Sequence, residues 1–187
     1  MSHAVYAFLC WGEDPVGQFE GSDFYQLLDE NNWSQAMASV NRKGEVTALC
    51  PESDYRGRGW LQKKLENELA ERRWEVAVKF AEEIAVWEIG QAILYLTPQE
   101  ERQEGENEGI EDAITALRKT LAQKAGEAPG WAMRHAAAMI EQADERVGPF
   151  TTVYTNAYSS IRAVSLTRDA LRVEEDDAVI LFVDIHT

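Results

Sequence analysis

The most apolar segments of the chain lie at its two ends, at residues 4–11 and 178–185. Both segments are apolar at odd and even positions alike, so a strand formed by either one would be apolar on both faces. Such strands are typical of the inside of a covered sheet. We therefore expect both segments to lie inside one sheet that closes the chain at its termini. Gly-Glu-Asp-Pro at residues 12–15 breaks the first strand.

Weaker signals predict a short helix and a hairpin after the first strand. Ser22 is a suitable N-cap for a helix over residues 23–30. Residues 37–40 and 45–49 predict a hairpin, because the four residues between them end in Gly44 and suit a type I turn followed by a left-handed residue. Two more strand candidates precede the last strand, at residues 151–158 and 161–166.

The strongest helical signal runs over residues 60–96, where apolar side chains recur at spacings of three and four. The later part of this stripe consists of Ala77, Phe80, Ile84, Trp87 and Leu94. A helix of this length measures about 55 Å, which exceeds the roughly 30 Å diameter of a small domain. The helix therefore breaks, or it projects and pairs its stripe with a second copy in a homodimer, or the following helices fold back and cover it.

Two shorter helices are predicted at residues 110–123 and 131–147, each with an apolar stripe. Predicted strands flank a block of predicted helices, which favours the α+β class over alternating α/β. We predict one α+β domain over residues 1–187. Its antiparallel or mixed sheet is formed by the N- and C-terminal strands, and it carries a three-helix insertion at about residues 60–147.

Charge narrows the choice of partners. The chain has 33 acidic residues against 18 basic ones, a formal net charge of −15, and 45% hydrophobic residues, enough for a core. This charge disfavours direct binding of nucleic acid, whose phosphates require clustered Lys and Arg. No apolar run approaches the ~20 residues of a membrane span. Acids concentrate in a predicted loop over residues 99–112, and the candidates for contact with a partner are Glu100, Glu101, Glu104, Glu106 and Glu108.

A basic turn precedes the long predicted helix. Gly-rich residues 55–60 carry two arginines at the start of a helix, where free N–H groups favour an anion. The anion-binding candidates are Arg56, Arg58, Lys63 and Lys64. The spacing does not match a Walker loop, and a solvated turn paired with the excess acids is the competing interpretation. Trp60 and Trp74 lie among charged residues and are candidate exposed aromatic anchors for a partner.

Residues with catalytic chemistry are few. His135 has no nucleophile near it in the sequence. Cys10 would form a Cys-His-Asp constellation with Asp184 and His186 if the two apolar strands are neighbours. No Glu-x-x-His pair occurs, so we expect neither a metal nor a cofactor. Cys10 and Cys50 form no Cys-x-x-Cys pair, and the N-terminus lacks a secretory signal, which predicts reduced thiols and a cytoplasmic location.

Three functions remain open, and the first is favoured. It is a non-enzymatic acidic binding protein, of the inhibitor, immunity or adaptor type, that engages a basic protein and mimics the charge of a nucleic-acid backbone. The second is a structural subunit that assembles through the long helix. The third is a small enzyme that acts on an anionic substrate at the basic turn.

Overall fold

The computed structural model describes residues 3–21, 25–26, 34–49, 73–101, 109–144 and 176–186. Several predicted features lie outside these ranges: the basic turn, the strand candidates 151–158 and 161–166, and residues 60–72 of the long helix. Of the helix predicted at residues 23–30, the described part is Tyr25 and Gln26, and both are helical. In the described part of the chain, no helix is long and apolar enough to cross a membrane.

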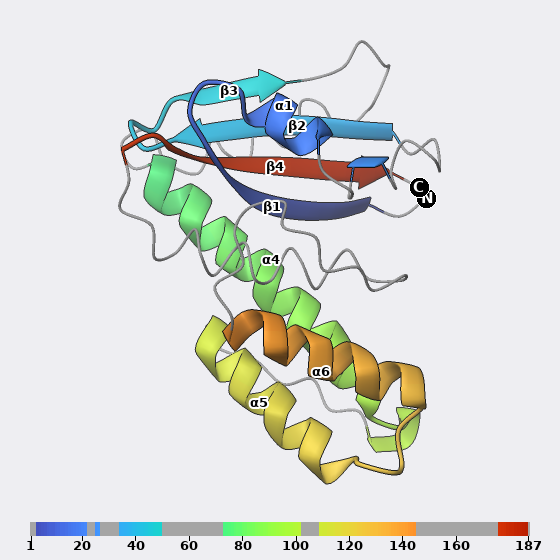
Figure 1. The fold of residues 1–187 in the computed structure, drawn as a ribbon. Coiled ribbons are helices and arrows are strands. Elements are labelled where there is room, and N and C mark those ends of the chain that lie inside the picture. Colours follow the sequence, from blue (N-terminus) through green and yellow to red (C-terminus); the bar gives the residue numbers. More distant parts are fainter. Residues whose placement is uncertain are drawn as a thin grey trace.

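Four described strands form one antiparallel sheet, with β1 at His3–Trp11, β2 at Ser34–Asn41, β3 at Val46–Leu49 and β4 at Ala178–His186. Their order is β1-β4-β2-β3 (Figure 1). His3 pairs with His186 at one end of β1 and Trp11 with Ala178 at the other, so the two ends of the chain lie side by side. The predicted α+β fold, with a sheet built from N- and C-terminal strands, is therefore confirmed.

The place of β1 in the sheet differs from the prediction. β4 lies between β1 and β2, as its apolar faces indicate, whereas β1 is the terminal strand of the described order. Both faces of β1 are nevertheless covered. Leu9 belongs to the core on one face and Phe8 to the core on the other. Two-sided burial depends on layers above and below a strand, and it does not require a neighbour on each edge.

The predicted hairpin is present. Val40 pairs with Val46 next to the turn, and Gly44 has a φ of +79°. The side chain of Asn41 closes the turn, because its Oδ1 accepts a hydrogen bond from the Glu45 N–H at 2.9 Å. A Cβ on Gly44 would meet the Cβ of Arg73 at 3.3 Å. Glycine is therefore required here both by the left-handed conformation and by the approach of the next helix.

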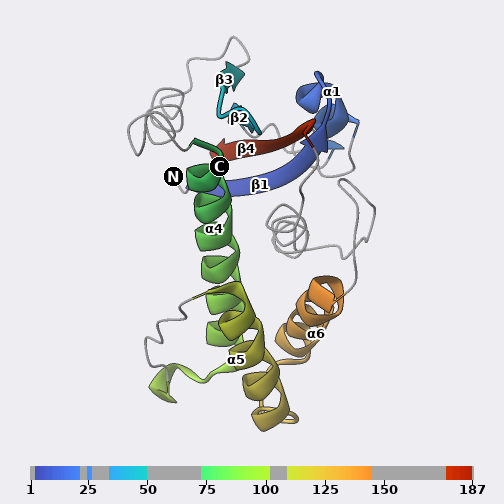
Figure 2. The same cartoon turned by 90° about the vertical axis from the view of Figure 1, so that its left-hand side faces the viewer.

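A short helix, α1 at Pro15–Glu20, occupies a place where the sequence indicates only a break. Proline suits the first helical position, and the Asp14 carboxylate accepts a hydrogen bond from the Gly17 N–H at 2.8 Å. The helix covers the face of the sheet opposite α4 (Figure 2). Its Phe19 ring lies 5.2 Å from that of Phe8.

The long helix, α4 at Arg73–Leu96, packs against two different partners along its length. Its first half lies under the sheet, where the rings of Phe80 and Phe182 stack with centroids 5.1 Å apart. Its second half packs against α5 at Ile110–Gln123 and α6 at Gly130–Asp144. The bounds of α5 agree with the prediction, and α6 is described as far as Asp144. The later helices therefore fold back on α4 within one chain (Figures 1 and 2).

This packing changes the argument for a homodimer. Phe80 is 7% exposed and Ile84 is 8% exposed, so the chain itself covers the middle of the stripe. Trp87, which follows them on the same helix face, is 58% exposed. The length of the helix no longer requires a second copy, and Trp87 is the large side chain of the stripe that remains on the surface.

We predict that Phe80→Ala lowers the free energy of unfolding by about 3–5 kcal/mol, because it removes a buried ring and leaves a cavity between α4 and the sheet. Trp87→Ala, at the exposed continuation of the same stripe, is the control and is expected to lower it much less. Urea unfolding followed by circular dichroism measures both. Equal losses would contradict the placement of Phe80 in the core.

Candidate functional site

A pocket of about 490 Å³ lies at the end of the sheet that carries the β2–β3 turn, at the left of Figure 1. Strands β1 and β4 meet there as well, since β1 ends where β4 begins. The backbone N–H of Gly12 donates to the Asp177 carbonyl at 3.0 Å and joins those two turns. The residues lining the pocket are Gly12, Glu13, Pro15, Ser39, Asn41, Lys43, Glu45, Thr47, Asp176, Asp177 and Val179.

Carboxylates from three distant segments surround this pocket. Asp14 adjoins it, and its carboxylate caps α1. Glu45 accepts a hydrogen bond from Asn41 Nδ2 at 2.6 Å and so holds the hairpin turn. Glu13, Asp176 and Asp177 are exposed, and within the described residues the structure gives their side chains no ion pair. We call these three residues the acidic rim. A ligand can therefore contact these three carboxylates without displacing an ion-pair partner among the described residues.

The floor of the pocket is polar. Ser39 is 7% exposed, and its side chain has no hydrogen-bond partner among the described residues. It lies on the α1 face of β2 beside Thr47 of β3, which pairs with it across the hairpin. Lys43 is the cation among the lining residues. The sequence shows no pattern that relates Glu13 to Asp176 and Asp177, so this site was not predicted.

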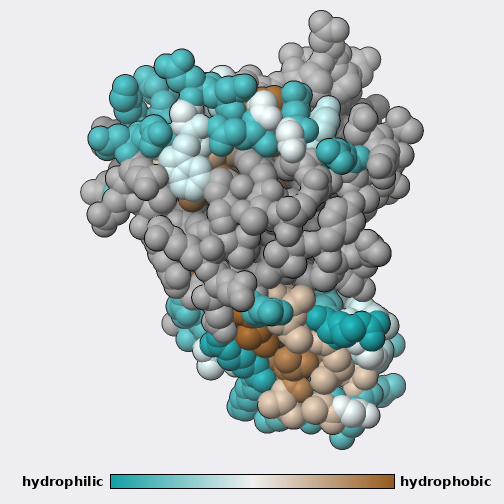
Figure 3. Space-filling view, viewed as in Figure 1, coloured by the Kyte–Doolittle hydropathy of each residue, from teal (hydrophilic) through white to brown (hydrophobic). Residues whose placement is uncertain are grey.

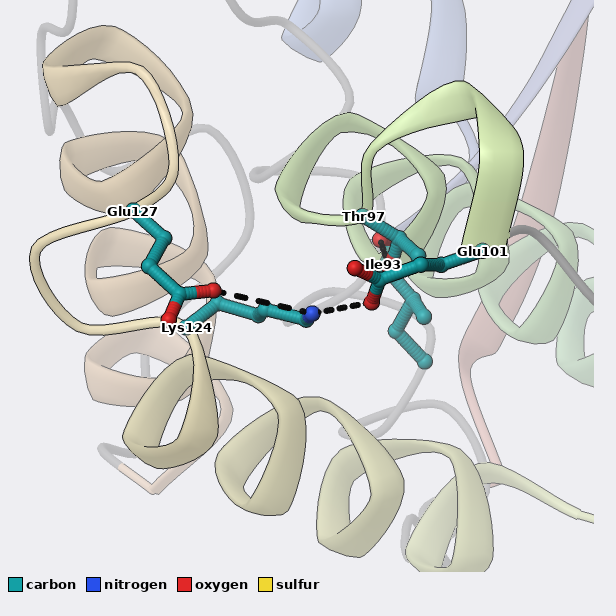
Figure 4. Close-up of polar contacts among 5 residues, drawn as sticks. All are labelled: Ile93, Thr97, Glu101, Lys124 and Glu127. Carbon is teal, nitrogen blue, oxygen red and sulfur yellow. Dashed lines mark hydrogen bonds and ion pairs between the residues drawn. The ribbon is translucent and has the colours of Figure 1, made fainter.

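The predicted acidic loop is described at its beginning and its end. Gln99–Glu101 forms a short 3-10 helix after α4, in which Glu100 is exposed. Glu101 forms an ion pair with Lys124, whose ammonium also lies 3.8 Å from Glu127 (Figure 4). The hydrogen bond that Lys124 donates to the Glu101 carboxylate raises the pKa of Lys124. Glu101 therefore joins the end of α4 to the α5–α6 turn. Glu104, Glu106 and Glu108 lie outside the described residues.

The predicted aromatic and basic contacts are described in part. Trp74 is half-buried against the core between α4 and the sheet, and the Arg42 guanidinium lies 4.9 Å from its ring centroid. One ring face of Trp74 is therefore occupied within the chain. Trp60 lies outside the described residues, as do the anion-binding candidates Arg56, Arg58, Lys63 and Lys64.

A second surface feature is aromatic and belongs to the helices. Trp87 is 58% exposed, Tyr95 42% and Trp131 41%. The rings of Tyr95 and Trp131 lie 5.3 Å apart, so α4 and α6 share one aromatic cluster. Hydrophobic colour gathers on the helical part of the molecule, whereas the described surface over the sheet is mainly hydrophilic (Figure 3). These three residues were not among the aromatic anchors that the sequence indicated, because helical spacing alone does not show where the sheet ends.

The suggested Cys-His-Asp constellation is wrong. Cys10 pairs with Val179 and lies in the core on the α1 face. Asp184 pairs with Val5 near the other end of the sheet, and strand alternation places it on the α4 face. Antiparallel pairing therefore separates the thiol from the carboxylate both along the strands and across the sheet. Cys10 is buried and unbridged, and burial raises the pKa of its thiol.

His135 lies inside the helical core, with its ring centroid 6.4 Å from that of Tyr95. It is 4% exposed, and loss of hydration lowers its pKa from 6.5 to about 4. A histidine that is neutral and buried in this way belongs to the packing of α6.

The chemistry of the described residues favours binding of a cation by separate carboxylates. Among them, no group of three or more His, Cys, Asp or Glu side chains is arranged to hold a metal ion. No family model, no curated protein and no solved structure matches this chain.

We predict that His135 makes the protein less stable in mild acid. The unfolded chain binds a proton at His135 near pH 6.5, whereas the folded protein does so only near pH 4. The free energy of unfolding therefore falls as the pH drops from 6.5 to 4, by up to about 3 kcal/mol. Urea unfolding at neutral pH and at about pH 5 measures this loss.

His135→Gln is the control, because glutamine keeps a polar side chain without a titration in this range. As the pH falls from 6.5 to 4, the free energy of unfolding should decrease more for the wild type than for His135→Gln, since the remaining titratable groups are the same in both. An identical pH dependence would contradict a lowered pKa for His135.

Proposed function

We propose that this chain is a non-enzymatic binding protein of the inhibitor, immunity or adaptor type, and that it engages a basic protein. The observation that carries the proposal is the acidic rim: Glu13, Asp176 and Asp177 meet at one pocket without an ion pair among the described residues. Like charges held together raise the energy of the folded state. A basic partner would relieve this repulsion, which makes the pocket end of the sheet the favoured contact surface.

The overall charge supports the same function through kinetics. A net charge of −15 attracts a basic protein over distances of about one Debye length, ~8 Å at physiological salt. Such steering raises association rates by 10- to 1,000-fold and falls with ionic strength. Carboxylates spread along one end of the sheet also resemble the spaced charges of a nucleic-acid backbone, so the natural partner would be a protein that binds nucleic acid.

The enzyme alternative depends on residues other than Cys10 and Asp184. Its anion-binding turn lies outside the described residues, and Cys10 and Asp184 lie on opposite faces of the sheet. We propose a cytoplasmic location, and the free, buried thiol of Cys10 is consistent with a reducing compartment.

The test begins with a native extract passed over the immobilised protein at low salt, followed by identification of the proteins released at high salt. We expect a basic protein among them. With that protein purified, stopped-flow mixing compares the wild type with the rim variant, Glu13→Gln with Asp177→Asn. The association rate should fall by about tenfold at low salt and by much less at high salt.

A matched control carries Glu83→Gln and Glu141→Gln, which remove the same charge from exposed positions on α4 and α6. It should associate nearly as fast as the wild type. A third variant neutralises Glu100, Glu104, Glu106 and Glu108 and leaves the Glu101 pair intact. Absence of any basic protein that is released by salt would contradict the proposed function. A larger effect of the third variant would move the contact surface to the acidic loop.

A second candidate function is self-assembly through the helices, and the exposed aromatic side chains favour it. Trp87 extends the Phe80–Ile84 stripe of α4 beyond the sheet, and the Tyr95–Trp131 cluster lies further along the same helix. Burial of large aromatic side chains contributes strongly to interfaces. In this arrangement a second copy of the chain would cover them.

For the homodimer we predict twice the mass of a single chain by sedimentation equilibrium at micromolar concentration, and the mass of one chain for Trp87→Glu. Because Trp87 is exposed, this variant should keep its helical signal in circular dichroism, whereas Phe80→Glu would place a charge in the core. A single-chain mass for the wild type throughout the micromolar range would exclude self-assembly.

A further inference from the structure

The pocket at the acidic rim differs from a plain cluster of acids in having a buried polar floor. Ser39 is 7% exposed, lines the pocket, and has no hydrogen-bond partner among the described residues. The residue as a whole is buried, but its hydroxyl is not among the enclosed side-chain atoms that lack a partner, so it is open to the pocket and can exchange a hydrogen bond with a ligand there.

The lining also separates into chemically distinct parts. Carboxylates of Glu13, Asp176 and Asp177 stand at the rim, the hydroxyls of Ser39 and Thr47 lie along the strands, and Pro15 and Val179 add apolar surface. A ligand that matches this lining has a cationic end with several donors and an apolar stem. The volume of about 490 Å³ lies within the ~300–1,000 Å³ range of sites that take a small ligand or a long side chain.

We propose that this pocket receives an arginine side chain of the basic partner, with the guanidinium between the acidic rim and Ser39. This assignment rests on the proposed function and names the chemistry that would anchor the partner. A guanidinium has five N–H donors in a planar fork, so it can meet carboxylates and a hydroxyl at the same time. Its alkyl stem packs on the apolar part of the lining.

A lysine fits these features less well. Its ammonium is a compact, strongly hydrated charge with three donors, and it loses more hydration on entering a pocket with a hydroxyl floor. Lys43 also lines the pocket, and its charge opposes an arginine and a lysine alike, so the number of hydrogen bonds decides between them. The hydrogen-bond acceptors of the acidic rim and of Ser39 lie apart from one another. They favour arginine, because a guanidinium donates more hydrogen bonds than an ammonium of the same charge.

The experiment titrates the whole protein with Nα-acetyl-arginine amide and follows amide chemical shifts by NMR. Nα-acetyl-citrulline amide, which has nearly the same shape but no charge, and Nα-acetyl-lysine amide are the comparison compounds. We expect the arginine compound to shift signals of the β2–β3 turn and of residues 12–14 and 176–179. Its affinity should be at least about fivefold higher than that of the lysine compound, with no saturable shifts from citrulline.

Variants then assign the contacts. The rim variant should weaken binding of the arginine compound by about tenfold or more, and Ser39→Ala by about threefold. Lys43→Gln should strengthen it by about twofold, because it removes an opposing charge. The control with Glu83→Gln and Glu141→Gln should leave the affinity within about twofold of the wild type. Unchanged thermal unfolding of each variant shows that the fold is retained.

The outcomes separate this inference from the proposed function. Equal binding of the lysine compound, or equal weakening by the rim variant and the control, would overturn the arginine pocket. If a basic partner still binds in that case, the proposed function stands and its contacts lie elsewhere on the acidic surface. If neither the arginine compound nor any basic protein binds, both are overturned.

Discussion

The structure depends on one helix that belongs to two hydrophobic cores. The first half of α4 packs under the sheet through Ala77, Phe80 and Ala81, and the second half packs on α5 and α6 through Ala85, Ile89 and Ala92. The alanines are at most 1% exposed. Their small side chains let the helix approach a sheet at one end and two helices at the other. Without α4, the inner face of the sheet and the helical pair would each expose apolar surface to water.

The same antiparallel sheet that fits onto α4 also brings the acids together. Strands β1 and β2 end, and β3 and β4 begin, at one end of the sheet. Turns at that end are exposed, and exposed turns tolerate Asp and Glu. Hydrogen bonds such as Gly12 N–H to the Asp177 carbonyl hold the turns close in spite of the repulsion between their side chains. The acidic rim is therefore a consequence of the strand order.

Local patterns predicted much of the fold because they act over a few residues. The hairpin followed from Gly44 and its flanking strands, and α5 from an apolar stripe with acids in its first turn. The short helix α1 was missed, because Asp14 and Pro15 are read equally well as a turn or as a cap followed by a first helical residue. The position of β1 at the end of the described strand order was missed, because the side-chain pattern reports burial of faces and does not report strand order.

The candidate site was largely beyond sequence reasoning. The sequence indicated Glu101 as part of a free acidic loop. In the structure Glu101 forms an ion pair with Lys124, because the α5–α6 turn lies beside the end of α4 (Figure 4). The sequence by itself determined the element types, the excess of negative charge and the apolar ends, because these depend on composition and short-range periodicity. Only the tertiary structure decided which charges meet and which aromatic side chains stay exposed. Glu13 and Asp177 come from opposite ends of the chain, and only the pairing of β1 with β4 brings them to one pocket.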